Sequence, residues 1–286
     1  MEGATGKEKK MATGDREPGP VKAIFVTGGA SGIGRAVAEL FSRRGWRVGL
    51  ADIDEAGMAA TAAGLPPERT SVHRLDVRDR AGWTQALKDF AGASGGRLDV
   101  LFNNAGIAQG GPLATATDED LDRVVAINLM GPLNGARAAY PYLKATPNSC
   151  LLNTASAAGI YGAAGLVPYS ATKFGVRAMT EGLEGEWGPD GIKVRDLMPG
   201  FIDTPLIAGT ISGSNQSIRE AVESRGLEVT PVGEVAEAAW RAVHGRRLHT
   251  PVGKTARRLF FLARFLPNLL RGGQRGLAGK RQPTER

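Results

Sequence analysis

A tyrosine and a lysine lie four residues apart in the stretch 167-VPYSATKFG-175, whose residue pattern indicates a helix. Side chains four residues apart share one face of a helix, so the phenol of Tyr169 and the ammonium of Lys173 can converge on one point. A phenol beside an ammonium could serve acid/base catalysis, and it could equally be a solvated surface pair. The spacing alone leaves both interpretations open.

Short apolar runs alternate with longer amphipathic segments from residue 21 onward. This alternation predicts the α/β fold class: a doubly wound parallel (Rossmann) sheet, flanked by helices on both faces, in a single domain. The first helix is expected over 34–45, where apolar residues recur at helical spacing and Gly45 can end it. The expected strands are 22–28, 47–52, 71–77, 98–105, 149–156 and 192–200.

The first expected strand leads directly into the glycine-rich turn 27-TGGASGIG-34 and then into a helix. Backbone amides at a helix N-terminus attract anions, so this turn can hold a diphosphate. Gly28, Gly32 and Gly34 would permit the tight turn, the close approach of a ligand and the close packing of the helix, and Ser31 can add a hydroxyl donor. A glycine-rich turn is weak evidence alone, and its place after a first strand strengthens it.

The second strand ends in 50-LADID-54, which puts Asp52 18 residues after Gly34. A carboxylate at that distance can accept hydrogen bonds from the adenosine ribose and repel a 2′-phosphate, which favours NAD over NADP. The alternative is an ordinary turn aspartate at the end of a strand. Two further strand ends carry 75-LDV-77, where Asp76 could accept from an adenine amino group, and the small-residue turn 103-NNAG-106.

These motifs, with Asn128 in 124-VVAINLMG-131, Ser156 thirteen residues before Tyr169, and 199-PGFIDTP-205, together resemble the short-chain dehydrogenases/reductases over about residues 22 to 250. The resemblance implies a hydride-transferring enzyme in which Tyr169 is the general acid/base, Lys173 lowers the pKa of Tyr169, Ser156 binds the substrate oxygen and Asn128 holds a water. It also implies contacts with NAD(H), and less readily with NADP, at Gly28, Ser31, Gly32, Ile33, Gly34, Asp52, Ile53, Asp76, Val77, Asn104, Ala105, Gly106, Tyr169, Lys173, Pro199, Gly200, Ile202 and Thr204.

The composition limits other functions. The chain has 286 residues and a net charge of +7, but residues 253 to 286 hold nine Lys/Arg against Glu285, so the rest of the chain is nearly neutral. No nucleic-acid-binding motif accompanies the basic tail, and we expect no nucleic-acid partner. A single cysteine, Cys150, argues for a reducing compartment, and no apolar run reaches the roughly 18 residues of a membrane span. We therefore expect a cytoplasmic protein whose three histidines have no metal-ligand spacing.

The segment after the Pro-Gly motif, roughly 205–231, is predicted to be a mobile lid, with Leu206, Ile207 and Ile211 on its inner face. The loop 157–165 and Gln109 are expected to line the same pocket. Small and apolar residues in these segments indicate an apolar secondary alcohol or ketone as the substrate. The family resemblance also implies a homodimer or homotetramer.

We predict three regions: a disordered extension over 1–20, the dehydrogenase domain over 21–252 and a basic amphipathic tail over 253–286 that becomes disordered beyond 272. In the tail, Leu259, Leu262 and Leu266 with Phe261 and Phe265 form an expected apolar face, and Pro267 ends the helix. Residues 254–271 could pack against a subunit, which we favour, rest on an anionic membrane, or close the substrate pocket. The alternative to an enzyme is a dinucleotide-binding regulatory or scaffold protein of the same fold.

Overall fold

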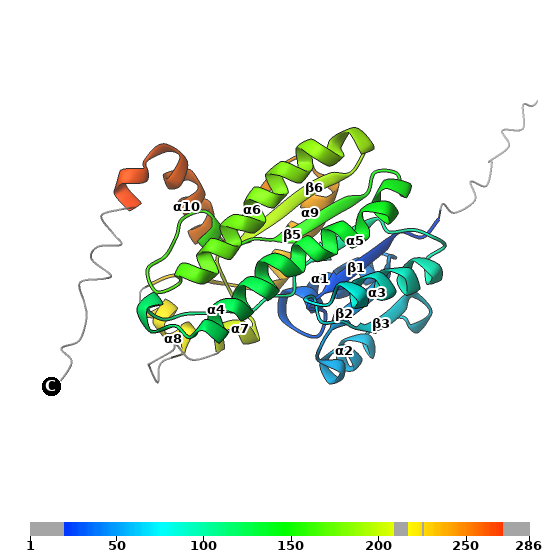
Figure 1. Ribbon diagram of the computed structural model, residues 1–286, viewed down its shortest axis with the longest axis horizontal. Helices are drawn as coiled ribbons and strands as arrows, with labels where there is room; N and C mark the ends of the chain where they lie inside the picture. The colour runs from blue at the N-terminus through cyan, green and yellow to red at the C-terminus, as the bar shows by residue number, and fades with distance from the viewer. Residues whose placement is uncertain (1–19, 209–216, 225, 271–286) are drawn as a thin grey trace, which may run out of the picture.

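A computed structural model describes residues 20–208, 217–224 and 226–270. Its centre is a seven-stranded, entirely parallel sheet in the order β3-β2-β1-β4-β5-β6-β9. The strands are β1 Ala23–Thr27, β2 Arg47–Asp52, β3 Thr70–Arg74, β4 Val100–Asn103, β5 Cys150–Thr154, β6 Lys193–Pro199 and β9 His249–Val252. The chain passes from β1 outward to β3 and then returns to β4 on the other side of β1 (Figure 1). In such sheets the reversal of strand order leaves a crevice at the carboxyl ends of the two strands, here β1 and β4.

Helices cover both faces of the sheet because alternate strand residues point to opposite sides. One apolar cluster joins Ile24 and Val26 of β1 to α1 and α9, and the other joins Phe25 to α3, α5 and α6. Figure 1 shows these helices packed along the strands. Their bounds are α1 Gly32–Arg43, α2 Glu55–Ala62, α3 Arg80–Ala93, α4 Asp118–Val125, α5 Gly131–Ala145, α6 Val167–Trp187 and α9 Val232–His244.

The six strands that the sequence predicts are all present in the sheet, and the fold-class prediction is confirmed. The seventh strand, β9, was not predicted. It is four residues long and contains Pro251, which a central strand would not tolerate because proline lacks an N–H. Among the described residues β9 is an edge strand that pairs only with β6, so the missing N–H is accommodated.

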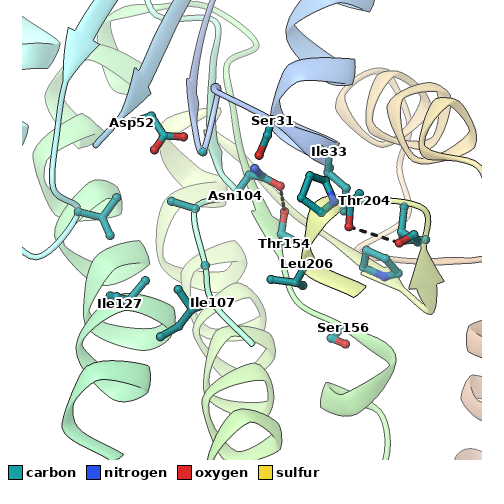
Figure 2. Close-up of a pocket in the computed structure, with 18 of the residues that line it drawn as sticks. Ser31, Ile33, Asp52, Asn104, Ile107, Ile127, Thr154, Ser156, Thr204 and Leu206 are labelled. Atoms are coloured by element: carbon teal, nitrogen blue, oxygen red, sulfur yellow. Dashed lines mark hydrogen bonds between the residues drawn. The ribbon is translucent and has the colours of Figure 1, made fainter. Parts of the chain in front are cut away.

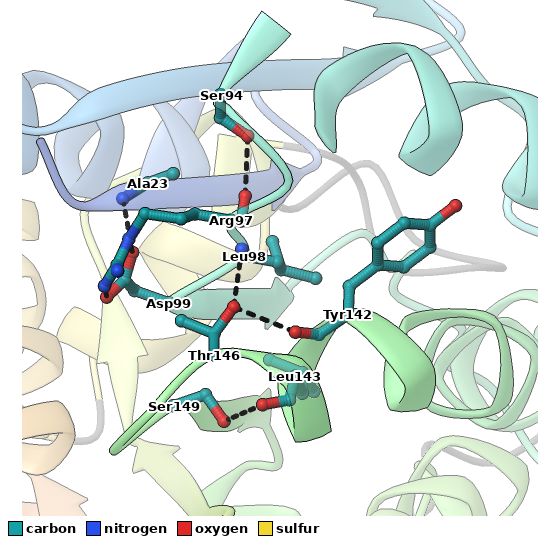
Figure 3. A network of polar contacts seen from close by, with 9 residues as sticks. All are labelled: Ala23, Ser94, Arg97, Leu98, Asp99, Tyr142, Leu143, Thr146 and Ser149. Atoms are coloured by element: carbon teal, nitrogen blue, oxygen red, sulfur yellow. Dashed lines mark hydrogen bonds and ion pairs between the residues drawn. The ribbon is translucent and has the colours of Figure 1, made fainter. Parts of the chain in front are cut away.

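Polar side chains close the amino ends of β1, β4 and β5, opposite to the crevice (Figure 3). The buried carboxylate of Asp99 accepts a hydrogen bond from the Ala23 backbone N–H at 2.9 Å and pairs with Arg97 at 2.7 Å. Thr146 accepts from the N–H of Leu98 at 3.1 Å. These contacts satisfy backbone groups that would otherwise be buried without partners, and they fix the strands from the end away from the crevice.

The segments after β6 complete the carboxyl-end side of the sheet. They are β7 Phe201–Ile202, paired in parallel with β8 Val229–Thr230, and the short helices α7 Pro205–Ala208 and α8 Ile218–Glu223. The predicted lid therefore contains two short helices and a strand among its described residues. Ile211 lies outside the described residues, as do most of the segments predicted to be disordered.

The tail helix α10 spans Lys254–Phe265 and ends before Pro267, whose ring disfavours helical backbone in the preceding residue. The prediction that Leu259, Phe261 and Phe265 share one apolar face is wrong. Leu259 faces the domain with Phe260, whereas Phe261 and Phe265 are exposed on the opposite side. No helix among the described residues is long and apolar enough to cross a bilayer.

Candidate active site

A pocket of about 440 Å³ opens at the carboxyl ends of the central strands. Figure 2 shows Asp52 and Ser156 at different ends of this pocket, with Asn104 and Leu206 between them and Ile107 beside Ile127. The walls come from the turns after β1 to β6 and from α6 and α7. The residues that line it are Gly28, Ser31, Gly32, Ile33, Ala51, Asp52, Ile53, Leu75, Asp76, Val77, Arg78, Asn104, Ala105, Gly106, Ile107, Ile127, Thr154, Ala155, Ser156, Tyr169, Lys173, Pro199, Gly200, Ile202, Thr204, Pro205, Leu206 and Ile207.

The glycine-rich turn is shaped by contacts that no larger residue would allow. Gly28 has a φ of +69°, and a Cβ on Gly34 would lie 2.0 Å from the Gly28 carbonyl oxygen. The side chain of Asn104 donates to the Thr27 carbonyl at 3.0 Å and so ties the turn after β4 to the end of β1. Ser31 precedes α1, but its hydroxyl does not cap the helix, and the first turn of α1 has no acidic residue. These helix amides and this hydroxyl are therefore suited to a dinucleotide diphosphate.

The Asp52 carboxylate accepts three backbone hydrogen bonds. Its Oδ2 accepts from the N–H of Ala30 at 3.1 Å, which holds the glycine-rich turn, and its Oδ1 accepts from Ile53 at 2.8 Å and from Asp54 at 3.1 Å. A carboxylate has about four acceptor sites, so Asp52 keeps roughly one for a ligand hydroxyl. Asp52 is thus a turn residue as well as a charged residue of the pocket.

Asp76 and Arg78 form an ion pair at the edge of the pocket. The Arg78 guanidinium donates to both carboxylate oxygens of Asp76, with the shortest contact at 2.6 Å. These hydrogen bonds hold the pKa of Asp76 below its ordinary value. The sequence analysis did not predict Arg78 as a pocket residue, although Arg78 directly follows the strand-end motif 75-LDV-77.

Tyr169 and Lys173 lie on the first turns of α6 and both line the pocket. The Lys173 ammonium lies 5.7 Å from the centroid of the Tyr169 ring and donates to the Thr154 carbonyl at 2.8 Å. Burial lowers the pKa of Lys173 to about 8 and raises the pKa of the Tyr169 phenol. A hydrogen bond with the Ser156 side chain opposes the rise at Tyr169. Both groups are therefore displaced from their solution behaviour by desolvation.

Ser156 follows β5 and precedes the short helix η4, Ala157–Gly159. Its Oγ accepts a hydrogen bond from the Ala158 N–H at 3.1 Å, so the side chain caps this turn. The cap uses only an acceptor site, so the one hydroxyl proton can be donated either to Tyr169 or to a ligand in the pocket. Ser156 can therefore serve both the turn and the pocket.

Asn128 lies in η3, a single π-helical turn over Ala126–Met130 that joins α4 to α5. Its side chain is fully buried; Oδ1 accepts from the Ile107 N–H and Nδ2 donates to the Ile107 carbonyl, each at 2.9 Å. A Cβ on Gly106 would lie 3.1 Å from this Oδ1 and 3.7 Å from the Lys173 ammonium nitrogen. Asn128 thus fixes the turn after β4 directly beside Lys173.

The pocket gathers all the predicted site residues except two. Gly34 lies behind the glycine-rich turn, and Asn128 lies behind the turn after β4. Gln109 and the loop 157–165, which were expected to line the pocket, are absent from its walls in the described part of the chain. The described residues also contain no group of three or more His, Cys, Asp or Glu side chains that could hold a metal ion.

Comparisons with known proteins agree with this architecture. The family model of the short chain dehydrogenases matches residues 22–214. Momilactone A synthase of Oryza sativa subsp. japonica is 35% identical over 216 residues, which cover 74% of this chain and 77% of that protein.

Two solved structures carry the same fold. Levodione reductase superimposes with a TM-score of 0.76 at 27% identity, covering 82% of this chain and 98% of that chain. A short-chain dehydrogenase/reductase from Burkholderia phymatum in complex with NAD superimposes with a TM-score of 0.74 at 26% identity, covering 93% and 97%. The chain therefore belongs to the short-chain dehydrogenase/reductase family and is an oxidoreductase with a nicotinamide dinucleotide-binding Rossmann fold.

Proposed function

We propose that the protein is an NAD(H)-dependent enzyme that interconverts an apolar secondary alcohol and its ketone, with Ser156, Tyr169 and Lys173 as catalytic residues. The observation that carries the proposal is that these three side chains line one pocket with the glycine-rich turn and Asp52. When bound there, the nicotinamide supplies or accepts the hydride. The protein residues must then manage the proton and the charge on the substrate oxygen.

Tyr169 is the proposed general acid/base. Burial keeps its phenol protonated in the free protein, which suits proton donation to a carbonyl oxygen. In the oxidation direction Tyr169 must first lose its phenol proton, and a nearby positive charge stabilises the resulting phenolate. The Lys173 ammonium can supply that charge, because Lys173 lies four residues after Tyr169 on α6 and lines the same pocket. Ser156 donates a hydrogen bond to the substrate oxygen, keeps its own proton and stabilises the charge that develops on that oxygen.

Asn128 is proposed to position this machinery. Its amide oxygen accepts from the Ile107 N–H, and its amide nitrogen donates to the Ile107 carbonyl. Gly106 lies next to both the Asn128 amide and the Lys173 ammonium. The further donor and acceptor capacity of the amide can hold a water that connects Lys173 with solvent.

Asp52 supports NAD rather than NADP as the cofactor. Its negative charge lies at the end of β2, where it would repel a 2′-phosphate. Arg78, the cation at this end of the pocket, is already paired with Asp76. The relative from Burkholderia phymatum was solved with NAD, which supports a nicotinamide dinucleotide in the matching pocket.

The substrate end of the pocket is apolar. Ile107, Ile202, Leu206 and Ile207 line it, and α7 carries the last two residues. The cations among the lining residues are Arg78, engaged by Asp76, and Lys173, engaged by Thr154. A carboxylate or phosphate on the substrate would therefore find no free positive partner among these residues, which favours an uncharged apolar alcohol or ketone.

A homodimer or homotetramer is proposed as the assembly. Met130, Leu133 and Phe174 are exposed on or beside α5 and α6, and a second hollow of about 380 Å³ lies between these helices. Apolar side chains exposed together on paired helices are typical of a subunit interface. The proposal that the enzyme works in the cytoplasm rests on the sequence expectation alone.

The proposed function is tested by titrating the purified protein with NADH and with NADPH, and then by following nicotinamide absorbance over a panel of steroid, terpene and aromatic alcohols and ketones. We expect tighter binding of NADH and turnover of one apolar class. Binding of NADH without turnover would favour the regulatory or scaffold alternative, and failure to bind either nucleotide would contradict the cofactor assignment.

A further inference from the structure

Helix α10 is fixed to the domain by one of its faces. Ala256 is fully buried, and Leu259 and Phe260 pack against an apolar cluster formed by β6, α6 and the segment after β5 that includes η4. The first turn is anchored as well, because the Glu228 carboxylate accepts from the Lys254 backbone N–H at 2.7 Å. The opposite face is therefore held outward in a defined orientation (Figure 1).

The outward face of α10 combines two aromatic rings with three cations. The side chains of Phe261 and Phe265 are 56% and 64% exposed, and their ring centroids lie 4.9 Å apart. Arg257, Arg258 and Arg264 are exposed on the same helix. Within the described residues none of the three arginines takes part in an ion pair, and the sequence of α10 contains no acidic residue.

Apolar exposure and positive charge continue past the helix. Leu266 and Leu269 are 46% and 66% exposed, directly after α10. The sequence from residue 253 to residue 286 carries nine cations and one acid, which is a net charge of +8. The chain from α10 onward therefore combines exposed apolar side chains, as far as Leu269, with a large excess of positive charge in its sequence.

A second copy of the chain or a lipid bilayer could cover such a face, and the charge of the face distinguishes between these two partners. A symmetric contact with a second copy would set this face against itself, so that the arginines of both copies would repel one another. An anionic bilayer instead offers phosphates to the guanidinium groups and an apolar boundary to the aromatic rings. The charge pattern matches the bilayer and opposes the symmetric dimer.

We propose that α10 docks the protein on the surface of an anionic phospholipid bilayer. Phe261 and Phe265 lie at the boundary between headgroups and acyl chains, and Arg257, Arg258 and Arg264 contact lipid phosphates. The docking face is separate from the active-site pocket, because α10 contributes none of the residues that line the pocket. The inference is independent of the proposed reaction, since it rests only on the exposed face of α10.

The test is cosedimentation of the full chain with phosphatidylcholine vesicles and with vesicles that also contain phosphatidylserine. We expect binding to the mixed vesicles only, weakened by added salt because exposed charges are screened. Arg257→Gln/Arg258→Gln/Arg264→Gln should lower the partition coefficient on the order of 100-fold, at about fivefold per cation. Phe261→Ser/Phe265→Ser should lower it at least about tenfold.

The matched control is Arg241→Gln/Arg246→Gln/Arg247→Gln, which removes three exposed charges in and after α9 and should bind like the wild type. Thermal melts of all variants check that the fold is retained. The proposal is overturned by equal binding to neutral and anionic vesicles, by no binding at all, or by variants of α10 that bind as well as the control. Self-association of the wild type that Phe261→Ser/Phe265→Ser abolishes would assign the face to a second copy instead.

Discussion

Substitution of Lys173 by methionine should change how the stability of the protein depends on pH. Burial lowers the pKa of Lys173 from its ordinary value of 10.5 to about 8 in the folded protein. At 1.36 kcal/mol per pH unit, this difference corresponds to about 3 kcal/mol in the free energy of unfolding. The buried ammonium therefore destabilises the folded state at neutral pH, and the site retains it despite this cost.

The sign of the pH dependence follows from which state binds the proton. Below pH 8 the lysine is protonated in both states, and the full destabilisation is present. Between pH 8 and 10.5 the folded state loses the proton while the unfolded state keeps it, so the free energy of unfolding rises by about 3 kcal/mol. Lys173→Met lacks this rise. At pH 7 the variant should be up to about 2 kcal/mol more stable, because the Thr154 carbonyl loses its donor at a cost of about 1 kcal/mol or more.

The assay is urea denaturation of the wild type and Lys173→Met at intervals between about pH 7 and pH 11, which spans the titration window. The difference between the two proteins removes the contribution of the other titrating groups, since they are common to both. Lys88→Met, which alters an exposed lysine of α3, is the matched control and should run parallel to the wild type. Parallel curves for Lys173→Met and the wild type would refute the argument that the ammonium is desolvated.

Three further substitutions test the support of the pocket. Gly34→Ala would place a Cβ 2.0 Å from a carbonyl oxygen and should lower the free energy of unfolding by about 3 kcal/mol. The control Gly182→Ala, whose Cβ would have no atom within 4 Å, should raise the free energy of unfolding by roughly 0.5 kcal/mol. Equal effects of the two substitutions in urea denaturation would contradict the packing argument. Asp52→Asn should raise the ratio of NADPH to NADH affinity about tenfold in fluorescence titrations, and an unchanged ratio would remove Asp52 from cofactor selection. Asn128→Ala leaves two backbone groups without partners and should destabilise the protein by about 2 kcal/mol, so a wild-type denaturation midpoint would refute its positioning role.

The central strands could be predicted because β1, β2, β4, β5 and β6 are buried on both faces and appear in the sequence as mainly apolar runs. The strand β9 lacks such a run, and its identity depends on pairing with β6, which no local pattern reveals. The split of α10 into an inward and an outward face was hidden for a similar reason. Leu259 and Phe261 differ little in hydropathy, and only the position of the domain decides which of them is buried.

The candidate site shows the same division. The strand-end motifs could be found from the sequence because the fold brings all carboxyl ends to one edge. The hydrogen bonds that hold these residues within the folded protein could not be predicted from the sequence. The three amides on Asp52, the hold of Asn128 on Ile107, and the acceptor that Thr154 provides to Lys173 all join positions that are distant in the sequence or depend on the shape of a turn. Arg78 and Thr154 were nonetheless within reach, since each lies within two residues of a motif already recognised.

The central claim is that Tyr169 exchanges the proton while the pocket holds NAD(H). Its most direct test compares Tyr169→Phe with the wild type in two measurements, NADH binding by fluorescence titration and turnover of an alcohol or ketone that the wild type accepts. The account predicts a loss of turnover of about 100-fold to 10,000-fold, which is the range of general acid/base catalysis, with NADH affinity changed by no more than about threefold. Turnover of Tyr169→Phe at nearly the wild-type rate would contradict it.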